Sequence, residues 1–210
     1  MNKVAFLTTV FPENEKFLKP FFNSLNKQTY KNYDLIIVND NFKNINFYKN
    51  FYSNLNIIDI NSSNTPAKNW EVGINYCIDQ NYDVLVFGDS DDYFKDNRIE
   101  KSLEFLKKSD VVVSDLSLFN YNGIYEKNYL SNRLKNLDII DFEFIKDKNI
   151  FGMTNTAVRL KGIEKVSFGK KIIAVDWHFF KRMLKKGCKA IFTNETESFY
   201  RQHKNNTAGL

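Results

Sequence analysis

Apolar and polar residues alternate along the first half of the chain with two different spacings. Short apolar runs, typical of strands covered on both faces, occupy residues 4–10, 33–40, 55–60, 82–88 and 110–116. Apolar side chains recur at helical spacing in residues 13–28, 66–80 and 97–108. Strands that alternate with helices form right-handed βαβ units. The pattern therefore predicts an α/β fold with a mostly parallel central sheet flanked by helices.

The pattern becomes looser after about residue 117. Asn122 and Gly123 predict a turn between two irregular strands. The next expected elements are a short helix over residues 141–149, a strand over 152–160, and a helix over 175–187 that Gly187 closes. Two short β segments should follow between residues 190 and 203. No linker or repeat separates the two halves, so we expect one domain over residues 1–210.

The stretch VFGDSDDYF, residues 86–94, ends a predicted buried strand with three carboxylates, Asp89, Asp91 and Asp92. Like charges at this spacing repel one another, so a cation is expected among them. Another predicted strand ends at Asp40. Ligands of parallel α/β sheets bind outside the carboxyl ends of the strands. Both groups of acids should therefore face one crevice.

Other uses of such an acidic cluster fit less well. An EF-hand loop needs Gly at its sixth position, where this chain has Phe94. Phosphatases of the aspartyl-phosphate type use D-x-D-x-T, but Tyr93 stands in place of the Thr. Capping of the following helix stays open, although one carboxylate would be enough for it. The favoured interpretation is a hard divalent cation, Mn²⁺ or Mg²⁺, completed by the phosphates of a ligand.

Composition and charge narrow the function classes. With 30 basic and 25 acidic residues the net charge is +5, which suits an anionic small ligand or a membrane surface. No run of five or six basic residues occurs, so nucleic acid is not an expected partner. Two distant cysteines, Cys77 and Cys188, fit a reducing cytoplasm. We interpret the start as a buried strand rather than a signal peptide, and no apolar run reaches the ~20 residues that span a bilayer.

Five short stretches, taken in order, resemble family 2 glycosyltransferases of the GT-A fold: VAFLTTV, LIIVND, FGDSDD, VDW and YRQH. The similarity extends over nearly the whole chain. A D-x-D alone is weak evidence, whereas five elements in the family's order are specific. The resemblance implies a GT-A-type nucleotide-diphospho-sugar transferase fold. Residues 1–116 would form its nucleotide-binding half and residues 117–210 its acceptor-side half.

The resemblance also implies where a metal and a diphosphate would bind. The two outer acids of D-x-D, Asp89 and Asp91, would hold Mn²⁺ or Mg²⁺ against the donor's diphosphate. The Y-R-x-H element near the end of the chain would bring His203 to the metal and Arg201 to a phosphate. The alternative interpretation is that the side chains of His203 and Arg201 are simply exposed to solvent.

Contacts with the nucleotide are implied at four further positions. Asp40 would contact the base, and Thr9 at the end of the first strand would lie beside it. Asn41 replaces the Gly that the family has after this Asp, and Asn is the next-best residue for a left-handed turn. Lys68 in K-N and Ser90 inside D-x-D would also touch the nucleotide. A solvated surface is an equally good interpretation of Lys68.

The VDW element implies a catalytic base at Asp176. Val175 stands where the family has Glu, which affects how the carboxylate is oriented. Because this position begins a predicted helix, an N-cap is the structural alternative. As a base, Asp176 would accept the proton of an acceptor hydroxyl that attacks the anomeric carbon opposite the leaving group, which inverts the configuration.

The resemblance leads to an expected reaction and to two rivals. The expected donor is a UDP-sugar, because UDP is the family's commonest nucleotide. The expected acceptor is a glycan or a lipid-linked molecule in surface polysaccharide synthesis, and the basic stretch from Lys181 to Lys186 suits peripheral contact with the inner face of a membrane. A sugar-nucleotide pyrophosphorylase would need a Gly-rich loop where TTVFPENEK has no Gly. A non-catalytic nucleotide- or glycan-binding module stays open.

Overall fold

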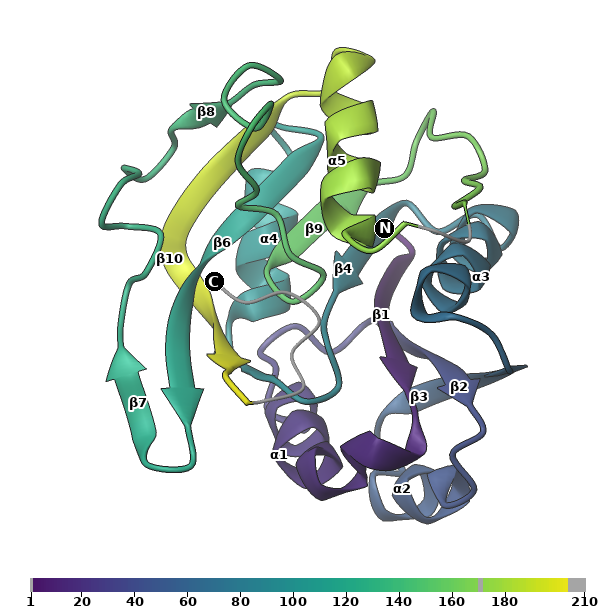
Figure 1. Ribbon diagram of the computed structural model, residues 1–210. Helices are drawn as coiled ribbons and strands as arrows, with labels where there is room; N and C mark the ends of the chain where they lie inside the picture. Colours follow the sequence, from purple (N-terminus) through teal and green to yellow (C-terminus); the bar gives the residue numbers. More distant parts are fainter. Residues whose placement is uncertain (1, 170–171, 204–210) are drawn as a thin grey trace.

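A parallel sheet forms the first half of the molecule (Figure 1). The computed structural model describes residues 2–169 and 172–203. Four neighbouring strands run parallel in the order β3 (Asn56–Ser62), β2 (Asp34–Asp40), β1 (Val4–Val10) and β4 (Val84–Phe87). Every residue of β1 is buried, as expected for a central strand covered on both faces.

Beyond β4 the sheet continues with strands of both directions. The order continues as β9 (Thr156–Arg159), β6 (Val111–Asn120), β10 (Ala190–Arg201) and β5 (Tyr93–Phe94). The short strand β9 lies antiparallel to both β4 and β6, whereas β10 runs parallel to β6. At the margins β7 (Gly123–Glu126) pairs with β6 and β8 (Ile139–Ile140) pairs with β10. By paired residues the sheet is mostly parallel, which confirms the α/β prediction.

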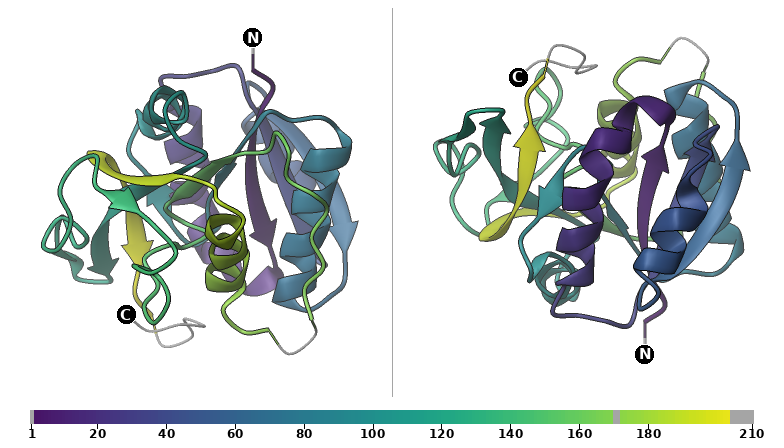
Figure 2. Two further views of the ribbon diagram at one scale, coloured as in Figure 1. Left: turned by 90° about the horizontal axis from the view of Figure 1, so that it is seen from above. Right: turned by 90° about the horizontal axis from the view of Figure 1, so that it is seen from below.

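Helices cover both faces of the sheet (Figure 2). One face carries α1 (Glu15–Asn26), α2 (Ile45–Phe51) and α4 (Arg98–Phe105), and the other carries α3 (Pro66–Asp79) and α5 (Val175–Lys185). Successive residues of β1 point to opposite faces: Phe6 packs with the α1 side and Leu7 with the α3 side. The apolar runs seen in the sequence therefore supply two cores separated by one sheet.

The structure corrects three local predictions. Residues 141–149 form turns instead of a helix: Asp141 Oδ1 accepts the N–H of Phe144 at 2.8 Å as at a helix start, but the Ile145 carbonyl, which a continuing helix would use internally, accepts a hydrogen bond from Trp177 Nε1 at 2.8 Å. The helix α2 was not predicted in its Asn-rich stretch; it packs through Tyr48, whose ring stacks on Phe22 at 5.0 Å. The two expected β segments near the end are one strand, β10.

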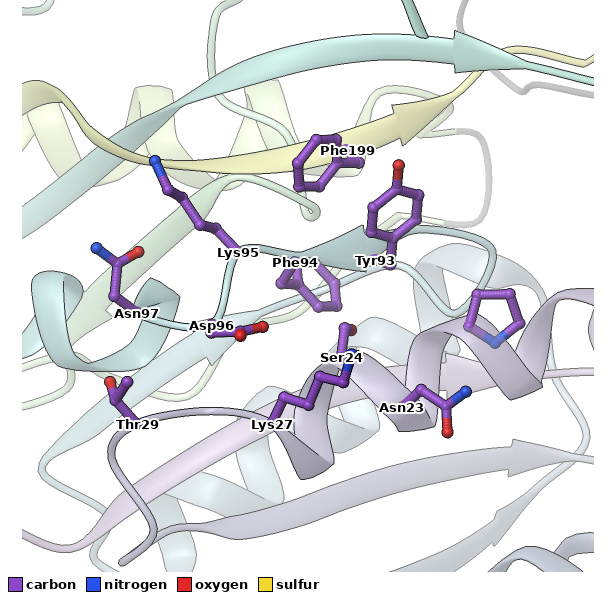
Figure 3. A pocket seen from close by; sticks show the side chains of 11 residues that line it. Asn23, Ser24, Lys27, Thr29, Tyr93, Phe94, Lys95, Asp96, Asn97 and Phe199 are labelled. Atoms are coloured by element: carbon purple, nitrogen blue, oxygen red, sulfur yellow. The ribbon is translucent and has the colours of Figure 1, made fainter. Parts of the chain in front are cut away.

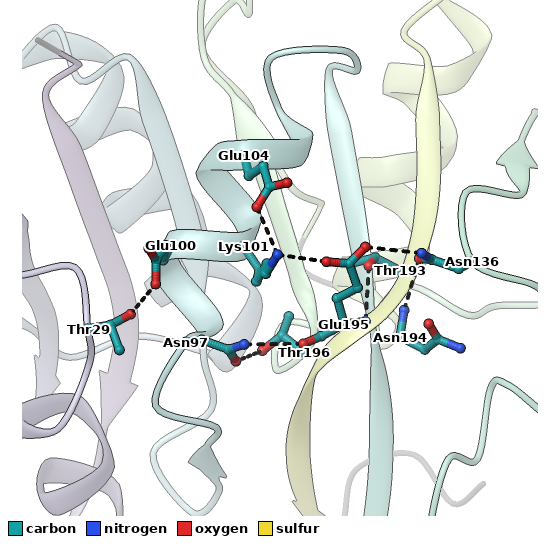
Figure 4. Close-up of polar contacts among 10 residues, drawn as sticks. All are labelled: Thr29, Asn97, Glu100, Lys101, Glu104, Asn136, Thr193, Asn194, Glu195 and Thr196. Carbon is teal, nitrogen blue, oxygen red and sulfur yellow. Dashed lines mark hydrogen bonds and ion pairs between the residues drawn. The ribbon is translucent and has the colours of Figure 1, made fainter.

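An irregularity in β10 explains why its sequence suggested two segments. The register with β6 shifts between Thr193 and Glu197. Polar contacts hold this region against α4 (Figure 4): Lys101 Nζ lies 2.7 Å from Glu195 Oε2, and Thr196 Oγ1 donates to Asn97 Oδ1 at 2.9 Å. After the shift, β10 continues along β6 and carries Arg201 to the edge of the sheet.

Within residues 2–169 and 172–203, none of the helices combines the length and the apolar character that crossing a membrane requires.

Candidate functional site

The carboxyl ends of β1, β2 and β4 meet at one edge of the sheet. Thr9 pairs with Val38 of β2, and Leu7 pairs with Phe87 of β4, so the segments that follow these strands leave the sheet side by side. Gly88 begins the acidic loop after β4, at a point where a Cβ atom would collide with the ring of Phe6. The chain therefore needs glycine there to bring the following acids to this edge.

The acids after Gly88 have unlike surroundings. Burial raises the pKa of Asp89 well above its usual range, and the charges of Asp91 and Asp176 raise it further. Asp92 is fully buried, and its Oδ1 accepts the backbone N–H of Arg201 at 2.7 Å. Burial and then the neighbouring Asp91 and Asp89 also raise the pKa of Asp92. Asp92 thus anchors the end of β10, while Asp89 and Asp91 keep partial exposure to solvent.

Two residues at the end of the described chain lie against this loop. Arg201 Nε donates to the carbonyl of Asp91 at 2.7 Å, and its guanidinium lies 4.4 Å from the ring of Phe17 and 4.3 Å from that of Phe119. His203 Nε2 lies 3.0 Å from Asp91 Oδ2, with its ring stacked on Phe17 at 5.5 Å. The predicted metal and phosphate residues of the D-x-D and Y-R-x-H elements are therefore brought together.

The donor atoms at this point suit a divalent cation. Carboxylate oxygens are the usual ligands of Mg²⁺ and Mn²⁺, and imidazole is a common ligand of transition metals. Asp91 and His203 are in contact, and Asp89 is close enough for the charge of Asp91 to raise its pKa. In the part of the chain that the structure describes, no three His, Cys, Asp or Glu side chains already converge as a ligand cluster. The residues fit a metal whose coordination is completed by a phosphate ligand.

Asp176 lies at the start of α5, near enough for its charge to act on Asp89. It is not the N-cap, which is Ala174, but its Oδ1 accepts the N–H of Trp177 at 2.6 Å and so still contributes to the helix start. Burial raises the pKa of Asp176, and the hydrogen bonds from Trp177 and Asn149 oppose that shift. Because its charge affects Asp89, the structure brings the predicted base to the predicted metal loop.

At the end of β2, the side-chain amide of Asn69 contacts Asp40, a contact that the sequence analysis did not predict. Asp40 Oδ2 accepts a hydrogen bond from Asn69 Nδ2 at 2.9 Å, and Asn69 also accepts one from Ser62 at 2.7 Å. Asn41 has φ of +62°, which confirms the left-handed turn expected there. Thr9 is almost completely buried in β1. In the sequence, the Lys68-Asn69 pair was the feature that could have indicated a role for Asn69.

Two predicted nucleotide residues have protein partners. Lys68 Nζ lies 2.7 Å from Glu71 Oε2, which also accepts the N–H of Phe168 at 2.5 Å. Ser90 is buried, and its hydroxyl accepts a hydrogen bond from Asn14 Nδ2 at 2.8 Å. These contacts tie α3 to the segment before α5, and the turn after β1 to the acidic loop. Any contact of Ser90 with a nucleotide would therefore be secondary to this positioning role.

A cavity of ≈590 Å³ lies beside α1 and β5, away from these residues (Figure 3). Its walls include the stacked rings of Tyr93 and Phe199, whose centroids are 4.4 Å apart, together with Lys27 and Lys95. None of the predicted site residues lines it. This cavity is therefore not the site that the sequence predicts.

Comparison with known proteins bears on the family and the fold. The family model described as "Glycosyl transferase family 2" matches residues 6–168. This span includes Asp40, Asp89 and Asp91, whereas Asp176, Arg201 and His203 lie beyond it. Among curated proteins, no sequence matches the chain.

Solved structures share the fold at low sequence identity. TarS residues 1–349 of S. aureus, in complex with UDP-GlcNAc, aligns with a TM-score of 0.75 and 15% identity over 99% of this chain and 62% of its own. The mannosyltransferase PcManGT of Pyrobaculum calidifontis, with GDP-Man and Mn²⁺, aligns with a TM-score of 0.72 and 12% identity over 98% of this chain and 59% of its own. GalNAc-T7, with UDP, GalNAc and Mn²⁺, gives a TM-score of 0.66 at 11% identity, over 98% of this chain and 45% of its own.

These alignments confirm the GT-A fold that the sequence resemblance implied. The chain spans about three-fifths of the TarS fragment that it matches. What it shares with these proteins is therefore the GT-A part of their structures.

Proposed function

Because the chain belongs to glycosyl transferase family 2, we propose that it transfers a sugar from a nucleotide-diphosphate donor to an acceptor hydroxyl with inversion of configuration. The observation that carries this proposal is the contact between Asp91 and His203, two residues from separate motifs, beside Asp89 and Asp176. A purely structural role gives no reason to place a carboxylate such as Asp89, whose pKa is raised by burial and by two neighbouring acids, at the edge of a sheet.

We assign the metal site to Asp89, Asp91 and His203. Their oxygen and nitrogen atoms suit Mn²⁺ or Mg²⁺, and Mn²⁺ accompanies the nucleotide ligands of PcManGT and GalNAc-T7. A bound cation would neutralise charge on the diphosphate leaving group as a Lewis acid. Arg201 is held by two aromatic rings beside the loop, where its guanidinium adds positive charge toward the phosphates.

We place the nucleotide base against Asp40 and Asn69. The two side chains fix each other through a 2.9 Å hydrogen bond, which leaves Asp40 Oδ1, shared with Asn41, as an acceptor for a base N–H. Thr9 is buried in β1, where it pairs with Val38 of the neighbouring strand, and Lys68 would have to exchange Glu71 for the nucleotide. The proposed nucleotide is uridine diphosphate, which is the ligand of TarS in its complexes, whereas PcManGT holds GDP-Man.

We assign the general base to Asp176. Burial raises its pKa, so its conjugate carboxylate is a stronger proton acceptor than an ordinary Asp. The acceptor hydroxyl would give its proton to Asp176 while its oxygen forms the new bond to the anomeric carbon. The bond from that carbon to the diphosphate breaks on the opposite face, so no enzyme nucleophile takes part.

The proposal extends to the class of acceptor and to the place of the reaction in the cell. We propose a hydroxyl of a glycan or a lipid-linked molecule as acceptor, in the synthesis of a surface polysaccharide on the cytoplasmic side of a membrane. The net charge of +5 is favourable for substrates that carry phosphate.

The experiment that tests the proposal is donor binding with and without Mn²⁺. In a calorimetric screen of UDP- and GDP-sugars, the wild-type protein should bind at least one donor more tightly with Mn²⁺, and Asp91→Ala should lose this metal-dependent part. Asp96→Ala is the matched control, because Asp96 is an exposed carboxylate five positions further along the chain. If Asp91→Ala keeps the full Mn²⁺ effect, the D-x-D loop has no part in donor binding.

A further inference from the structure

The ring of Phe17 contacts two residues of the candidate site at once. It stacks on the imidazole of His203, with 5.5 Å between the ring centroids and 23° between the planes, and the guanidinium of Arg201 lies 4.4 Å from it. Phe17 is buried, yet it is not among the described members of either hydrophobic core. This buried ring therefore belongs to the surroundings of the site.

Phe17 is held in a fixed place relative to the acidic loop. Just before α1, Asn14 Nδ2 donates to the hydroxyl of Ser90 at 2.8 Å, a contact between two buried side chains. Beyond Phe17, Leu18 and Phe21 anchor α1 in the core on that face of the sheet. Because Phe17 lies between these two attachments, its ring is a rigid support beside the loop.

His203 lies two residues beyond Arg201, the last residue of β10, so the pairing of the sheet does not set the direction of its imidazole. The imidazole is in contact with the ring of Phe17 and with Asp91 Oδ2, which lies 3.0 Å from Nε2. Neighbouring ligand atoms around a six-coordinate cation with bonds of about 2.1 Å are also about 3.0 Å apart. The stacked imidazole therefore already has the separation from Asp91 that a shared cation requires.

We propose that Phe17 is a positioning residue for metal binding: its ring holds the imidazole of His203 where it and Asp91 can bind one divalent cation. An imidazole that packing has already oriented loses less rotational freedom when the metal binds. Phe17 itself has no atom that ligates a metal. This inference rests on the metal site of the proposed function and adds a residue that assembles it.

Arg201 offers a second route by which Phe17 could affect the site, and Phe119 separates the two routes. The ring of Phe119 lies 4.3 Å from the same guanidinium, and its exposure is 6%, against 5% for Phe17. The ring that stacks on His203 is that of Phe17. Phe119→Leu should therefore disturb Arg201 while the imidazole keeps its support.

The test is Mn²⁺ binding to protein without nucleotide, followed by the electron paramagnetic resonance signal of the free ion. Wild type should bind Mn²⁺, and Asp91→Ala and His203→Ala should each weaken the binding. Phe17→Leu should raise the dissociation constant about tenfold, because groups that orient a metal ligand change metal affinity by about 10–100-fold. Phe17→Tyr keeps the ring and should bind Mn²⁺ like wild type. In the His203→Ala background, Phe17→Leu should have no further effect.

The matched control is Phe22→Leu, which removes another buried ring of α1. The ring of Phe22 stacks on Tyr48 at 5.0 Å and on Tyr52 at 5.1 Å, on the part of α1 that packs against α2. This variant should lower the melting temperature about as much as Phe17→Leu, because each loses one buried ring, yet bind Mn²⁺ like wild type. Phe119→Leu should also keep the wild-type affinity for Mn²⁺.

The outcomes separate this inference from the proposed function. If Phe17→Leu keeps the full affinity for Mn²⁺ while His203→Ala weakens it, the role of Phe17 is overturned and the metal site stands. Equal weakening by Phe17→Leu and by either Phe119→Leu or Phe22→Leu would also overturn that role, since the guanidinium or a general loss of packing would then explain it. No Mn²⁺ binding by wild type, or binding that Asp91→Ala leaves unchanged, would overturn the proposed metal site together with this inference.

Discussion

Neighbouring carboxylates of one loop perform different tasks in this protein. Asp92 points into the interior and holds the backbone of Arg201, whereas Asp91 points to His203 at the surface. Asp89 lies between the charges of Asp91 and Asp176, both of which raise its pKa in addition to burial. A cation would relieve this repulsion, and that is the physical reason for expecting metal binding here.

The variant Asp176→Asn separates proton transfer from the support that this side chain gives to the start of α5. Asn can still accept the N–H of Trp177 and caps helices about as well as Asp, so the melting temperature and donor affinity should stay near wild type. Loss of the proton acceptor should lower the transfer rate by about 10²–10⁴. The measurement is steady-state transfer to an acceptor, beside calorimetric donor binding.

The pH profile gives an independent check on Asp176. Burial raises its pKa, so in wild type the rate should fall, as pH decreases, at a higher pH than for an ordinary Asp. Near-normal transfer by the Asn variant would show that Asp176 only supports the start of α5.

Among the elements, α4 contains an unusual buried cation. Arg98 at its first turn is fully buried, and burial lowers its pKa to about 9. Its Nε donates to Ser198 Oγ, and Nη1 to Ser102 Oγ, while Nη2 has no partner among the described residues. No carboxylate in residues 2–169 and 172–203 lies within ion-pair distance of it. A positive charge at a helix N-terminus is also opposed by the helix dipole.

We therefore expect Arg98→Met to stabilise the protein. Both serine hydroxyls would remain satisfied, because Ser198 donates to the carbonyl of Thr154 and Ser102 to that of Arg98 itself. Removing a buried charge without an ionic partner should raise the free energy of unfolding by about 1–3 kcal/mol in urea titrations. Lys101→Met on the same helix is the control, where the exposed ion pairs make a change below about 1 kcal/mol. A clear loss of stability in Arg98→Met would mean that its charge is compensated in the fold.

For the whole molecule, buried weak acids limit stability at high pH. Burial raises the pKa of the Cys77 thiol to about 12, and it also raises the pKa of Tyr33 above its usual range. The pKa of Tyr82 is raised by burial and by the hydrogen bond that its hydroxyl donates to Asp34 at 2.6 Å. The unfolded chain releases these protons near their ordinary pKa values of about 8.5 and 10, whereas the folded chain retains them. Above those values the native state binds more protons, so the free energy of unfolding decreases as pH rises.

The corresponding prediction is a fall in the free energy of unfolding, measured by urea titration, between about pH 9 and pH 11, by up to ~1.4 kcal/mol per group and pH unit. Tyr33→Phe should make this dependence less steep, although loss of its hydrogen bond to the Leu25 carbonyl lowers stability at every pH. Tyr121→Phe, at a ring that is 79% exposed, is the control and should keep the wild-type slope. If the free energy of unfolding depends on pH equally in Tyr33→Phe and in wild type, Tyr33 does not contribute to the loss of stability at high pH.

Local features of the sequence determined much of the fold. The spacing of hydrophobic residues distinguishes strands from helices within a few residues, so β1 to β4 and the helices α1, α3 and α4 were predictable, as was the acidic loop after β4. The left-handed turn at Asn41 was predictable for the same reason, because backbone preference belongs to single residues. The resemblance to a family supplied the order of motifs and, with it, the GT-A fold.

Only the tertiary structure decided which distant residues meet. His203 and Asp91 are 112 positions apart, and their contact depends on β10 pairing beside β6 after a shift in register. The insertion of β9 between β4 and β6, and the helical state of α2, likewise depend on packing partners elsewhere in the chain. The separate roles of Asp91 and Asp92 follow from which one is covered by β10. Local propensity acts over a few residues, whereas burial and ion pairing depend on all elements that surround a side chain.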